Sequence, residues 1–252
     1  LRLLEYPKIL RRLAQFTFFS ASKDLALNLH PSTDIEEVRL RQKLTSEGKR
    51  LLSLRPSVSV GGARDVRGLV DRTAKAGVLE PFDFLDIAAT MDSARMMCQT
   101  VEKFGEELPN LGRIAAVIAD APELEKAVAR CIGRRGEILD EASPALGRIR
   151  NEMKLAHERL LKKLDEMLGS SHLKQAIQEP IVTVRNGRYV IPVKADFKGE
   201  VRGIIHDESA SGATVFVEPM ATVELNNQWR KLQLEEQHEV ERILRELSAH
   251  VA

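Results

Sequence analysis

Residues 206–209 are His-Asp-Glu-Ser, the side-chain types of a general base, an orienting carboxylate and a nucleophile. The residues before them have the alternating pattern of a β-strand. Neighbours on a strand point to opposite faces of a sheet, whereas a catalytic triad needs groups that converge in space. Asp and Ser also bond readily to the local backbone in turns, and Ser211-Gly212-Ala213 permits tight geometry. We therefore expect a turn at residues 206–209 and assign no catalytic residue to the chain.

A set of basic residues in the same region is the stronger functional candidate. Its members lie on the predicted strands or in the turns between them, and they are Arg185, Arg188, Lys194, Lys198 and Arg202. Phosphate groups are bound largely through such charges. The alternative is that these side chains are only solvated charges on exposed strand faces. The sequence therefore predicts a candidate nucleic-acid-binding surface without showing which of these residues share a face.

These basic residues belong to a predicted β-rich unit. Residues 181–185 and 188–194 flank Asn186-Gly187, the dipeptide favoured in a two-residue type I′ hairpin turn. Residues 200–206 and 214–218 are predicted as two further strands. Pro192 lacks an N–H group, which indicates that its strand lies at an edge or carries a bulge. So small a unit cannot bury much apolar surface, so we expect it to lean on neighbouring helices or on a partner.

Long helical patterns flank the β-rich unit on both sides. After Pro144, apolar residues recur at three- and four-residue steps, at Leu146, Ile149, Met153, Ala156, Leu160, Leu164 and Met167. The second stripe comprises Leu225, Trp229, Leu232, Val240, Ile243, Leu247 and Val251, with Glu236 as the one charged residue on it. Each helix would be roughly 40 Å long at 1.5 Å per residue. Neither stripe is wide enough to bury a helix on all sides, so we expect the two helices to pack antiparallel as a stalk with the β-rich unit at its tip.

The first half of the chain also has the periodicity of helices, at residues 4–16, 22–29, 34–54, 65–73 and 79–104. Thr33 and Glu36 have the spacing of a capping box. Gly61-Gly62 is followed by no Gly-Lys-Ser/Thr and predicts a plain turn rather than a phosphate loop. The fold class that these patterns predict is mainly α with a small antiparallel β unit (α+β).

Composition limits the other function classes. Of the 252 residues 43% are hydrophobic and 4% aromatic, and 38 Lys and Arg balance 37 Asp and Glu, so any basic surface must be local. Cys98 and Cys131 lack the spacing of a metal site or disulfide, and we expect reduced thiols and no bound metal. With neither a signal peptide nor a long apolar run, we expect a cytoplasmic protein that makes no membrane contact. The chain begins without Met and ends inside a helical pattern, so we expect a fragment of a longer protein.

Several long segments together resemble one family. They are LEYPKIL and LHPSTDIEEV, then SVGGARDVRGLVDRTAKAGVLEPFDFLDIA, then EILDEASPALGRIRNEM, and then QEPIVTVRNGRYVIPVKADFKGEVRGIIHDESASGATVFVEPMATVELNN. The chain resembles the N-terminal half of the second bacterial MutS paralogue, the MutS-two type, over nearly its whole length. Ala63 and Lys49 are minor departures from the family pattern.

This resemblance implies a division of the chain. A helical core domain would occupy residues 1–140, an ascending lever helix 141–170, a β-rich clamp 171–219 and a descending lever helix 220–252. The long antiparallel lever helices would carry the clamp at their tip. The family's separate mismatch-recognition domain has no counterpart here, which makes mismatch repair the less favoured role.

The resemblance also implies that the parent protein continues into a dimerising ATPase that uses ATP and Mg, followed by a small-MutS-related domain with nuclease character. This chain has no G-x-x-x-x-G-K-S/T motif, so we expect the fragment itself to bind no cofactor and to catalyse no reaction. The implied function is a homodimeric clamp on nucleic acid. Its target would be branched DNA, with suppression of homologous recombination, or the rRNA of stalled and collided ribosomes, with ribosome splitting and rescue. The alternative is a structural coiled-coil adaptor whose β tip binds a protein by strand addition.

Overall fold

The structure is a computed structural model that describes residues 5–59 and 61–252. Leu4, where the first predicted helix begins, and Val60, in the Gly61-Gly62 loop, lie outside the described residues. The chain divides into two compact units, each described here by itself. Unit 1 runs to Leu139 and includes Leu244–Ala252, and unit 2 is Asp140–Ile243. The mainly α fold with a small antiparallel sheet is confirmed.

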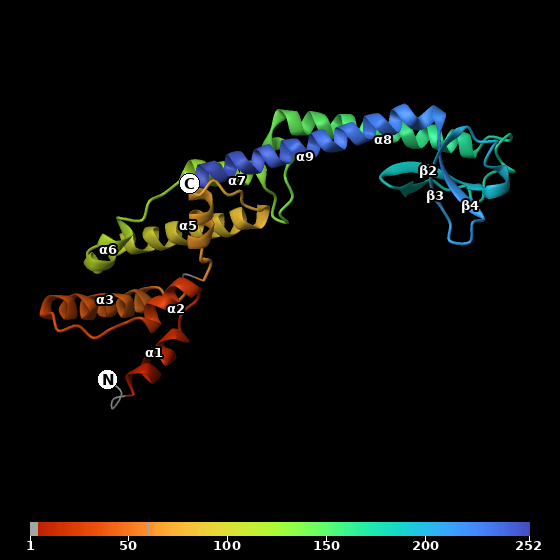
Figure 1. Cartoon of the computed structure of the whole chain (residues 1–252). Coiled ribbons are helices and arrows are strands. Elements are labelled where there is room, and N and C mark those ends of the chain that lie inside the picture. The colour runs from red at the N-terminus through yellow and green to blue at the C-terminus, as the bar shows by residue number, and fades with distance from the viewer. Residues whose placement is uncertain (1–4, 60) are drawn as a thin grey trace. The chain divides into compact units, whose positions relative to one another are not determined.

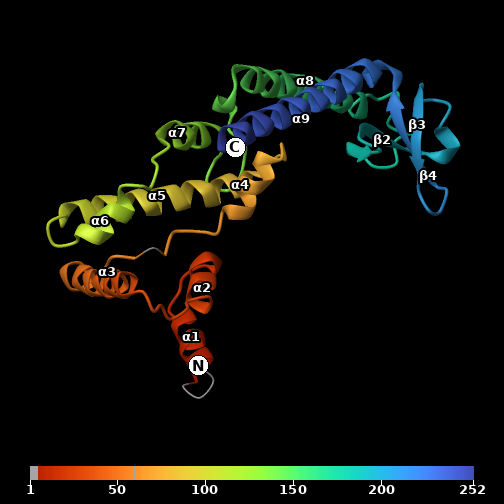
Figure 2. The same ribbon diagram turned by 60° about the vertical axis from the view of Figure 1, so that its left-hand side comes forward.

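Unit 1 consists of helices, which Figures 1 and 2 show from two directions. They are α1 (Tyr6–Ala14), α2 (Ser20–Leu27), α3 (Ile35–Leu54), α4 (Arg67–Ala74), α5 (Pro81–Lys103), α6 (Pro109–Ala115) and α7 (Pro122–Cys131), together with the end of α9 (Val223–Val251). The first five correspond to the predicted helices, whereas α6 and α7 were not predicted. The capping-box prediction was wrong, because Asp34 accepts the Glu36 N–H at 2.9 Å and is itself the N-cap of α3.

Glu47 of α3 holds the start of α6. Its carboxylate accepts the backbone N–H groups of Asn110, at 3.0 Å, and Leu111, at 2.8 Å, so a side chain from another helix satisfies amides that α6 cannot satisfy itself. Burial of Glu47 raises its pKa, but the hydrogen bonds from Leu111 and Asn110 outweigh burial and hold the pKa below its ordinary value. Ser248 of α9 makes a similar contact, because its hydroxyl oxygen accepts the Leu79 N–H at 2.9 Å.

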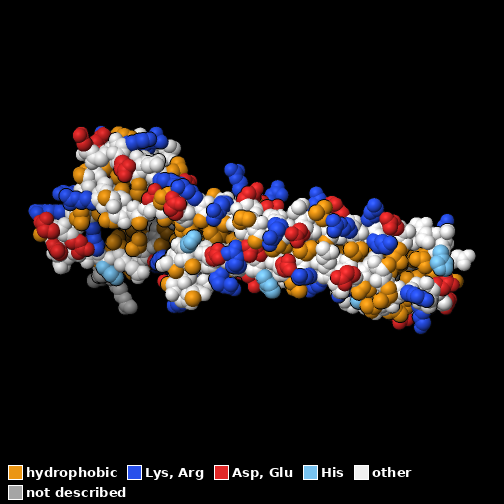
Figure 3. Space-filling model, turned by 90° about the horizontal axis from the view of Figure 1, so that it is seen from above, with side chains coloured by type: hydrophobic (Ala, Val, Ile, Leu, Met, Phe, Trp, Pro, Cys, Tyr) orange, Lys and Arg blue, Asp and Glu red, His pale blue; other side chains and the backbone are white. Residues whose placement is uncertain are grey.

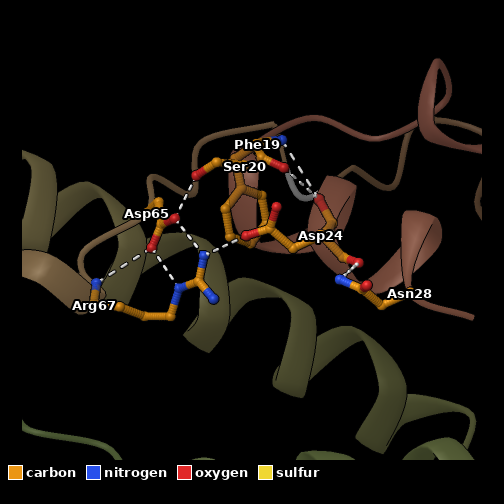
Figure 4. A network of polar contacts seen from close by, with 7 residues as sticks. Phe19, Ser20, Asp24, Asn28, Asp65 and Arg67 are labelled. Atoms are coloured by element: carbon orange, nitrogen blue, oxygen red, sulfur yellow. Dashed lines mark hydrogen bonds and ion pairs between the residues drawn. The ribbon is translucent and has the colours of Figure 1, made fainter.

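A polar network joins α2 to the start of α4 (Figure 4). The Arg67 guanidinium donates to Asp65 Oδ1 at 2.8 Å and Oδ2 at 2.6 Å, and to Asp24 Oδ2 at 3.0 Å. The Ser20 hydroxyl also donates to Asp65. The hydrogen bonds from Arg67 and Ser20 lower the pKa of Asp65 well below its ordinary range. The Arg67 and Asp24 side chains are more than half exposed and that of Asp65 is 24% exposed, so the network connects segments that are far apart in the sequence with its charges still open to water.

Unit 2 is built on α8 (Pro144–Leu168) and the larger part of α9. Their lengths of 25 and 29 residues correspond to about 38 and 44 Å. The Ser143 hydroxyl caps α8 by accepting the Leu146 N–H at 3.0 Å. The last residues of α9 belong to unit 1, so this helix is shared between the two units.

The two long helices lie side by side in opposite directions, as both views show. Contacts along α8 from its N-terminus meet positions progressively nearer the start of α9. They are Ser143 with Glu239 at 2.6 Å, Arg150 with Glu236 at 2.7 Å, and His157 with Trp229, whose rings stack with centroids 4.8 Å apart. The antiparallel packing predicted from the two stripes is thereby confirmed, and Glu236, the charge on the stripe, is explained by its ion pair with Arg150.

Four strands follow α8: β1 (Thr183–Arg185), β2 (Arg188–Lys194), β3 (Gly203–Glu208) and β4 (Thr214–Pro219). They form an antiparallel sheet in the order β1-β2-β4-β3. The type I′ turn is confirmed, because Asn186 and Gly187 both have positive φ, at 52° and 74°. The sheet packs its apolar face on α8, where Leu160 and Leu164 join Ile191, Val193, Val215 and Val217 in one buried cluster.

Two local predictions about the strands need correction. The bulge lies in β3 rather than at Pro192, since the register shifts between Ile205 and Asp207. β2 lies between β1 and β4 and is not an edge strand. Pro192 is tolerated because β1 pairs only as far as Val190, so no strand of the sheet needs its missing N–H. Residues 206–208 belong to β3 instead of a turn, and the turn follows at residues 209–213.

Candidate nucleic-acid interface

The turn of the β1–β2 hairpin folds back over β4 and β3. Arg185 lies over the Phe216 ring, with its guanidinium carbon 4.1 Å from the ring centroid, and pairs with Asp207 at 3.1 Å. The Asn186 amide donates to the His206 carbonyl at 2.9 Å. These contacts hold the hairpin turn against β4 and β3. Arg185 is therefore occupied within the fold.

Arg188, the second candidate, makes a buried ion pair. Its guanidinium lies 3.3 Å from Glu218 Oε1 and donates to Asn227 Oδ1 at 2.7 Å. The Glu218 side chain is only 1% exposed, and its other oxygen lies 2.6 Å from His206 Nε2. A carboxylate removed from water needs such partners, because an unpaired buried charge is strongly destabilising. Arg188 is therefore more than a solvated charge on an exposed strand face.

The first turn of α9 is joined to the same strand by Asn226, which is fully buried. Its side-chain oxygen accepts the Tyr189 N–H at 2.9 Å, and its side-chain nitrogen donates to the Tyr189 carbonyl at 3.1 Å. An amide side chain thus provides the donor and acceptor of a neighbouring strand at a residue beyond the pairing of β2 with β4. The Tyr189 ring also contacts His157 and Trp229, and burial raises the pKa of its hydroxyl.

Lys194 lies at the opposite end of β2 from the hairpin turn. Its ammonium donates to the Gln175 carbonyl at 3.0 Å and lies 5.9 Å from the centroid of the Phe197 ring. It carries no ion pair within residues 5–59 and 61–252. A phosphate could therefore approach this charge without displacing a carboxylate.

Lys198 and Arg202 are the most accessible of the predicted candidates. Both are exposed, and neither forms an ion pair in the part of the chain that the structure describes. Lys174 shares these properties, and it immediately precedes the Gln175 that Lys194 contacts. Sequence reasoning missed Lys174 because it belongs to neither a strand nor a helical stripe. The structure thus divides the candidates into Arg185 and Arg188, which are paired with acidic residues, and Lys194, Lys198 and Arg202, which are not.

The His-Asp-Glu-Ser stretch does not assemble as a triad. His206 contacts Glu218, whereas the Ser209 hydroxyl accepts the Thr214 N–H at 3.1 Å and lies 3.4 Å from the Ser211 hydroxyl. Asp207 is paired with Arg185. Across residues 5–59 and 61–252, no group of three or more His, Cys, Asp or Glu side chains is placed to hold a metal ion.

Charges elsewhere on the visible face are mixed. In Figure 3, Lys and Arg side chains alternate with Asp and Glu along that face, with no extended surface of one sign. Within the described ranges, no helix is both long and apolar enough to cross a membrane. The balanced composition predicts that any basic contact surface on this chain is local.

Comparison with known proteins identifies the family. No family model matches the chain. It is 43% identical to the endonuclease MutS2 of Thermomicrobium roseum and to that of Symbiobacterium thermophilum, and 41% identical to that of Bacillus mycoides. Each match covers 100% of this chain and 32% of the relative, so the chain spans about a third of the length of these proteins. The chain is therefore of the MutS2 type and belongs to the MutS family.

Proposed function

We propose that this chain grips nucleic acid with its four-stranded unit, which acts as a clamp at the end of a lever formed by α8 and α9. The observation that carries the proposal is a pair of exposed cations, Lys198 and Arg202, that form no ion pair within the described residues and lie between β2 and β3 of the sheet that joins the two long helices. The relatives are named endonucleases, a class of enzyme that acts on nucleic acid. The division into core, lever and clamp is part of this proposal.

The whole protein's activity is proposed from the likeness to MutS2 proteins. ATP and Mg, bound in a dimerising ATPase, would move the levers and thereby open or close the clamps. The clamped polymer is branched DNA, in suppression of homologous recombination, or ribosomal RNA, in rescue of stalled ribosomes. Both targets present phosphates to the same cations, so purification of the full-length protein followed by analysis of bound DNA and rRNA distinguishes them.

The direct test neutralises the free cations of the sheet unit. A variant with Lys174→Gln, Lys198→Gln and Arg202→Gln should bind branched DNA and rRNA fragments more weakly, with little dependence on base sequence. The slope of log affinity against log salt should fall by roughly one for each phosphate that the variant no longer neutralises. The matched control is Lys43→Gln, Lys49→Gln and Lys103→Gln, which removes the same charge from exposed positions of unit 1. Equal slopes for variant and control would exclude the sheet unit from the interface.

The alternative adaptor function is separated by the same salt titration. Strand addition to a protein partner depends on backbone hydrogen bonds and apolar contacts, so it weakens much less with salt than phosphate binding does. The missing P-loop motif further predicts that ATP gives this chain no protection against thermal unfolding. Protection by ATP would show a nucleotide site of a different kind.

A further inference from the structure

Strand β3 forms one edge of the four-stranded sheet and pairs only with β4. It exposes two large apolar side chains, Ile204 at 44% and Ile205 at 52%. The opposite edge, β1, has only three residues and contributes Arg185 to the fold of the hairpin. An exposed edge of this kind is a template for pairing with another strand. β3 is therefore the better site for strand addition.

The backbone groups of β3 that point outward can be identified from its bonds to β4 and the turn. Arg202 accepts the Met220 N–H at 2.9 Å, and Ser209 donates its N–H to Thr214 at 2.8 Å, so both ends of the strand direct these groups inward. Along a strand, the backbone N–H and C=O groups of successive residues point alternately toward and away from the neighbouring strand. Counting from each end, with one extra residue in the bulge at His206, leaves the backbone groups of Gly203, Ile205 and Glu208 pointing outward. Because the bulge takes up one residue, Gly203 and Glu208 lie equally far from Ile205 along the strand, opposite Pro219 and Val215 of β4. A second β3 running antiparallel would therefore match them with Ile205 opposite Ile205.

The charges of β3 have the same symmetry. Arg202 precedes the strand, and Asp207 and Glu208 end it, so the edge is basic at one end and acidic at the other. Arg202 and Glu208 form no ion pair within the described part of the chain. The Glu208 N–H takes the Asp207 carboxylate as its acceptor at 2.9 Å, as expected where no neighbouring strand provides one. An antiparallel copy brings the basic end of each strand beside the acidic end of the other.

We propose that β3 pairs with β3 of a second copy of this chain, joining the two sheets edge to edge around a two-fold axis near Ile205. The contacts are backbone hydrogen bonds at the outward positions, apolar contact between the paired isoleucines, and attraction between the basic end of each strand, at Arg202, and the acidic end of the other, at Glu208. A single short strand pair buries little surface, so the association is weak and concentration-dependent. The proposal does not rest on nucleic-acid binding, and its test contains no nucleic acid.

Sedimentation equilibrium at rising concentration, up to the millimolar range, tests the charge pattern. The unaltered chain should dimerise, and Arg202→Glu should raise the dissociation constant about tenfold, because each dimer then contains two repulsive contacts. Glu208→Arg should have a similar effect. The double variant Arg202→Glu, Glu208→Arg should recover most of the lost affinity, since the reversed charges again face opposite charges. Both residues are exposed, so circular dichroism should show an unchanged fold for each variant.

Cross-linking tests the position of the axis. Directly opposed residues of a hydrogen-bonded antiparallel pair have Cα atoms about 5.5 Å apart, within reach of a disulfide. In a chain with Cys98→Ser and Cys131→Ala, the variant Ile205→Cys should therefore oxidise to a covalent dimer. The matched control is Val184→Cys on β1, since Val184 is 47% exposed and Ile205 is 52% exposed.

The outcomes separate cleanly. A chain that stays monomeric at millimolar concentration overturns the proposal. So does a dimer that is unaffected by Arg202→Glu, or one that cross-links equally well through Val184→Cys and Ile205→Cys, since either result assigns the contact to another surface. Rescue by the double variant, together with cross-linking specific to Ile205→Cys, supports β3 pairing whether or not the sheet binds phosphate.

Discussion

In unit 2, apolar side chains of α8, the sheet and the segment between them share one buried cluster, whereas α2 and the segment between α1 and α2 of unit 1 leave large apolar side chains exposed. Leu160 and Leu164 are fully buried in that cluster. Phe16, Phe18 and Leu25 are 72%, 66% and 75% exposed. Apolar burial is the main favourable term in folding, so the difference indicates that unit 2 contains the more stable structure.

The polar contacts of the two units differ in the same direction. Unit 2 buries Glu218 to 1% exposure, where the Arg188 guanidinium compensates its charge and His206 Nε2 contacts its other oxygen. Unit 1 joins α2 to α4 through Asp65 and Arg67, whose side chains are 24% and 60% exposed. Removing a partner is strongly destabilising in the first case and nearly neutral in the second, because water can replace it only in the second.

The largest expected effect comes from placing a charge in the cluster of unit 2. Leu160→Asp should lower the free energy of unfolding by at least about 4 kcal/mol, since it removes buried apolar volume and leaves an unpaired carboxylate. Urea unfolding followed by circular dichroism measures this loss. Leu155→Asp is the control on the same helix, where the side chain is 43% exposed and little change is expected. Equal unfolding midpoints for the two variants would contradict the burial of Leu160 in this cluster.

The buried ion pair should give the next largest effect. Arg188→Gln removes the guanidinium beside Glu218, leaves His206 as its remaining side-chain contact, and should lower the free energy of unfolding by about 2 kcal/mol. Lys198→Gln, which removes an equal charge from an exposed position of the same unit, should leave stability unchanged. The pair of variants is compared by thermal unfolding. A loss of stability in both variants, or in neither, would show that burial does not decide how much these two cations contribute to stability.

The one buried carboxylate among the described residues of unit 1 sharpens the comparison. Glu47→Gln should destabilise the start of α6 by about 1 kcal/mol, because an amide is a weaker acceptor for the Asn110 and Leu111 N–H groups. The folded-state pKa of Glu47 lies below its ordinary value, so its stabilisation is complete above about pH 5 and is lost as the pH falls through the folded pKa.

Hydrogen exchange of the Asn110 and Leu111 amides measures this effect, with unit 2 amides as the internal reference. The unaltered chain should lose protection at these amides on acidification. The Glu47→Gln variant should start with less protection and show a smaller dependence on pH. Protection that is independent of pH in the unaltered chain would contradict the role assigned to the carboxylate.

The sequence predicts the long elements well because local periodicity and packing agree there. The stripes of α8 and α9 face each other, and the Asn186-Gly187 turn forms as predicted. The helices α6 and α7 were not predicted. α6 has only seven residues, and its first amides depend on Glu47, a residue more than sixty positions earlier in the chain. A contact of that range leaves no local signal.

The candidate site was predicted as a group of residue types but not as a geometry. Arg185, Arg188, Lys194, Lys198 and Arg202 look alike in the sequence, yet the first two are paired with acidic residues of other strands. Glu218 lies 30 positions from Arg188, and its burial follows from the hairpin folding over the sheet. Pairing of this kind depends on tertiary structure, so charge counting along the chain overestimates the number of free cations.

The smallest expected effect lies in the exposed network of unit 1. Asp65→Asn removes the negative charge and one of the two oxygens that accept from Arg67 and Ser20, yet Arg67 keeps its contact with Asp24 and all of these groups can be solvated. The global unfolding midpoint should therefore stay within experimental error.

The pKa of Asp65 is lowered in the folded chain, so the little stabilisation it gives is present above its ordinary pKa and disappears as the pH falls. The expected result is faster hydrogen exchange in the variant, confined to the start of α4. High salt screens the ion pairs, so it should produce the same faster exchange in the unaltered chain. A cooperative loss of stability comparable to that of Arg188→Gln would instead show that exposed charges fasten unit 1 as firmly as buried ones fasten unit 2.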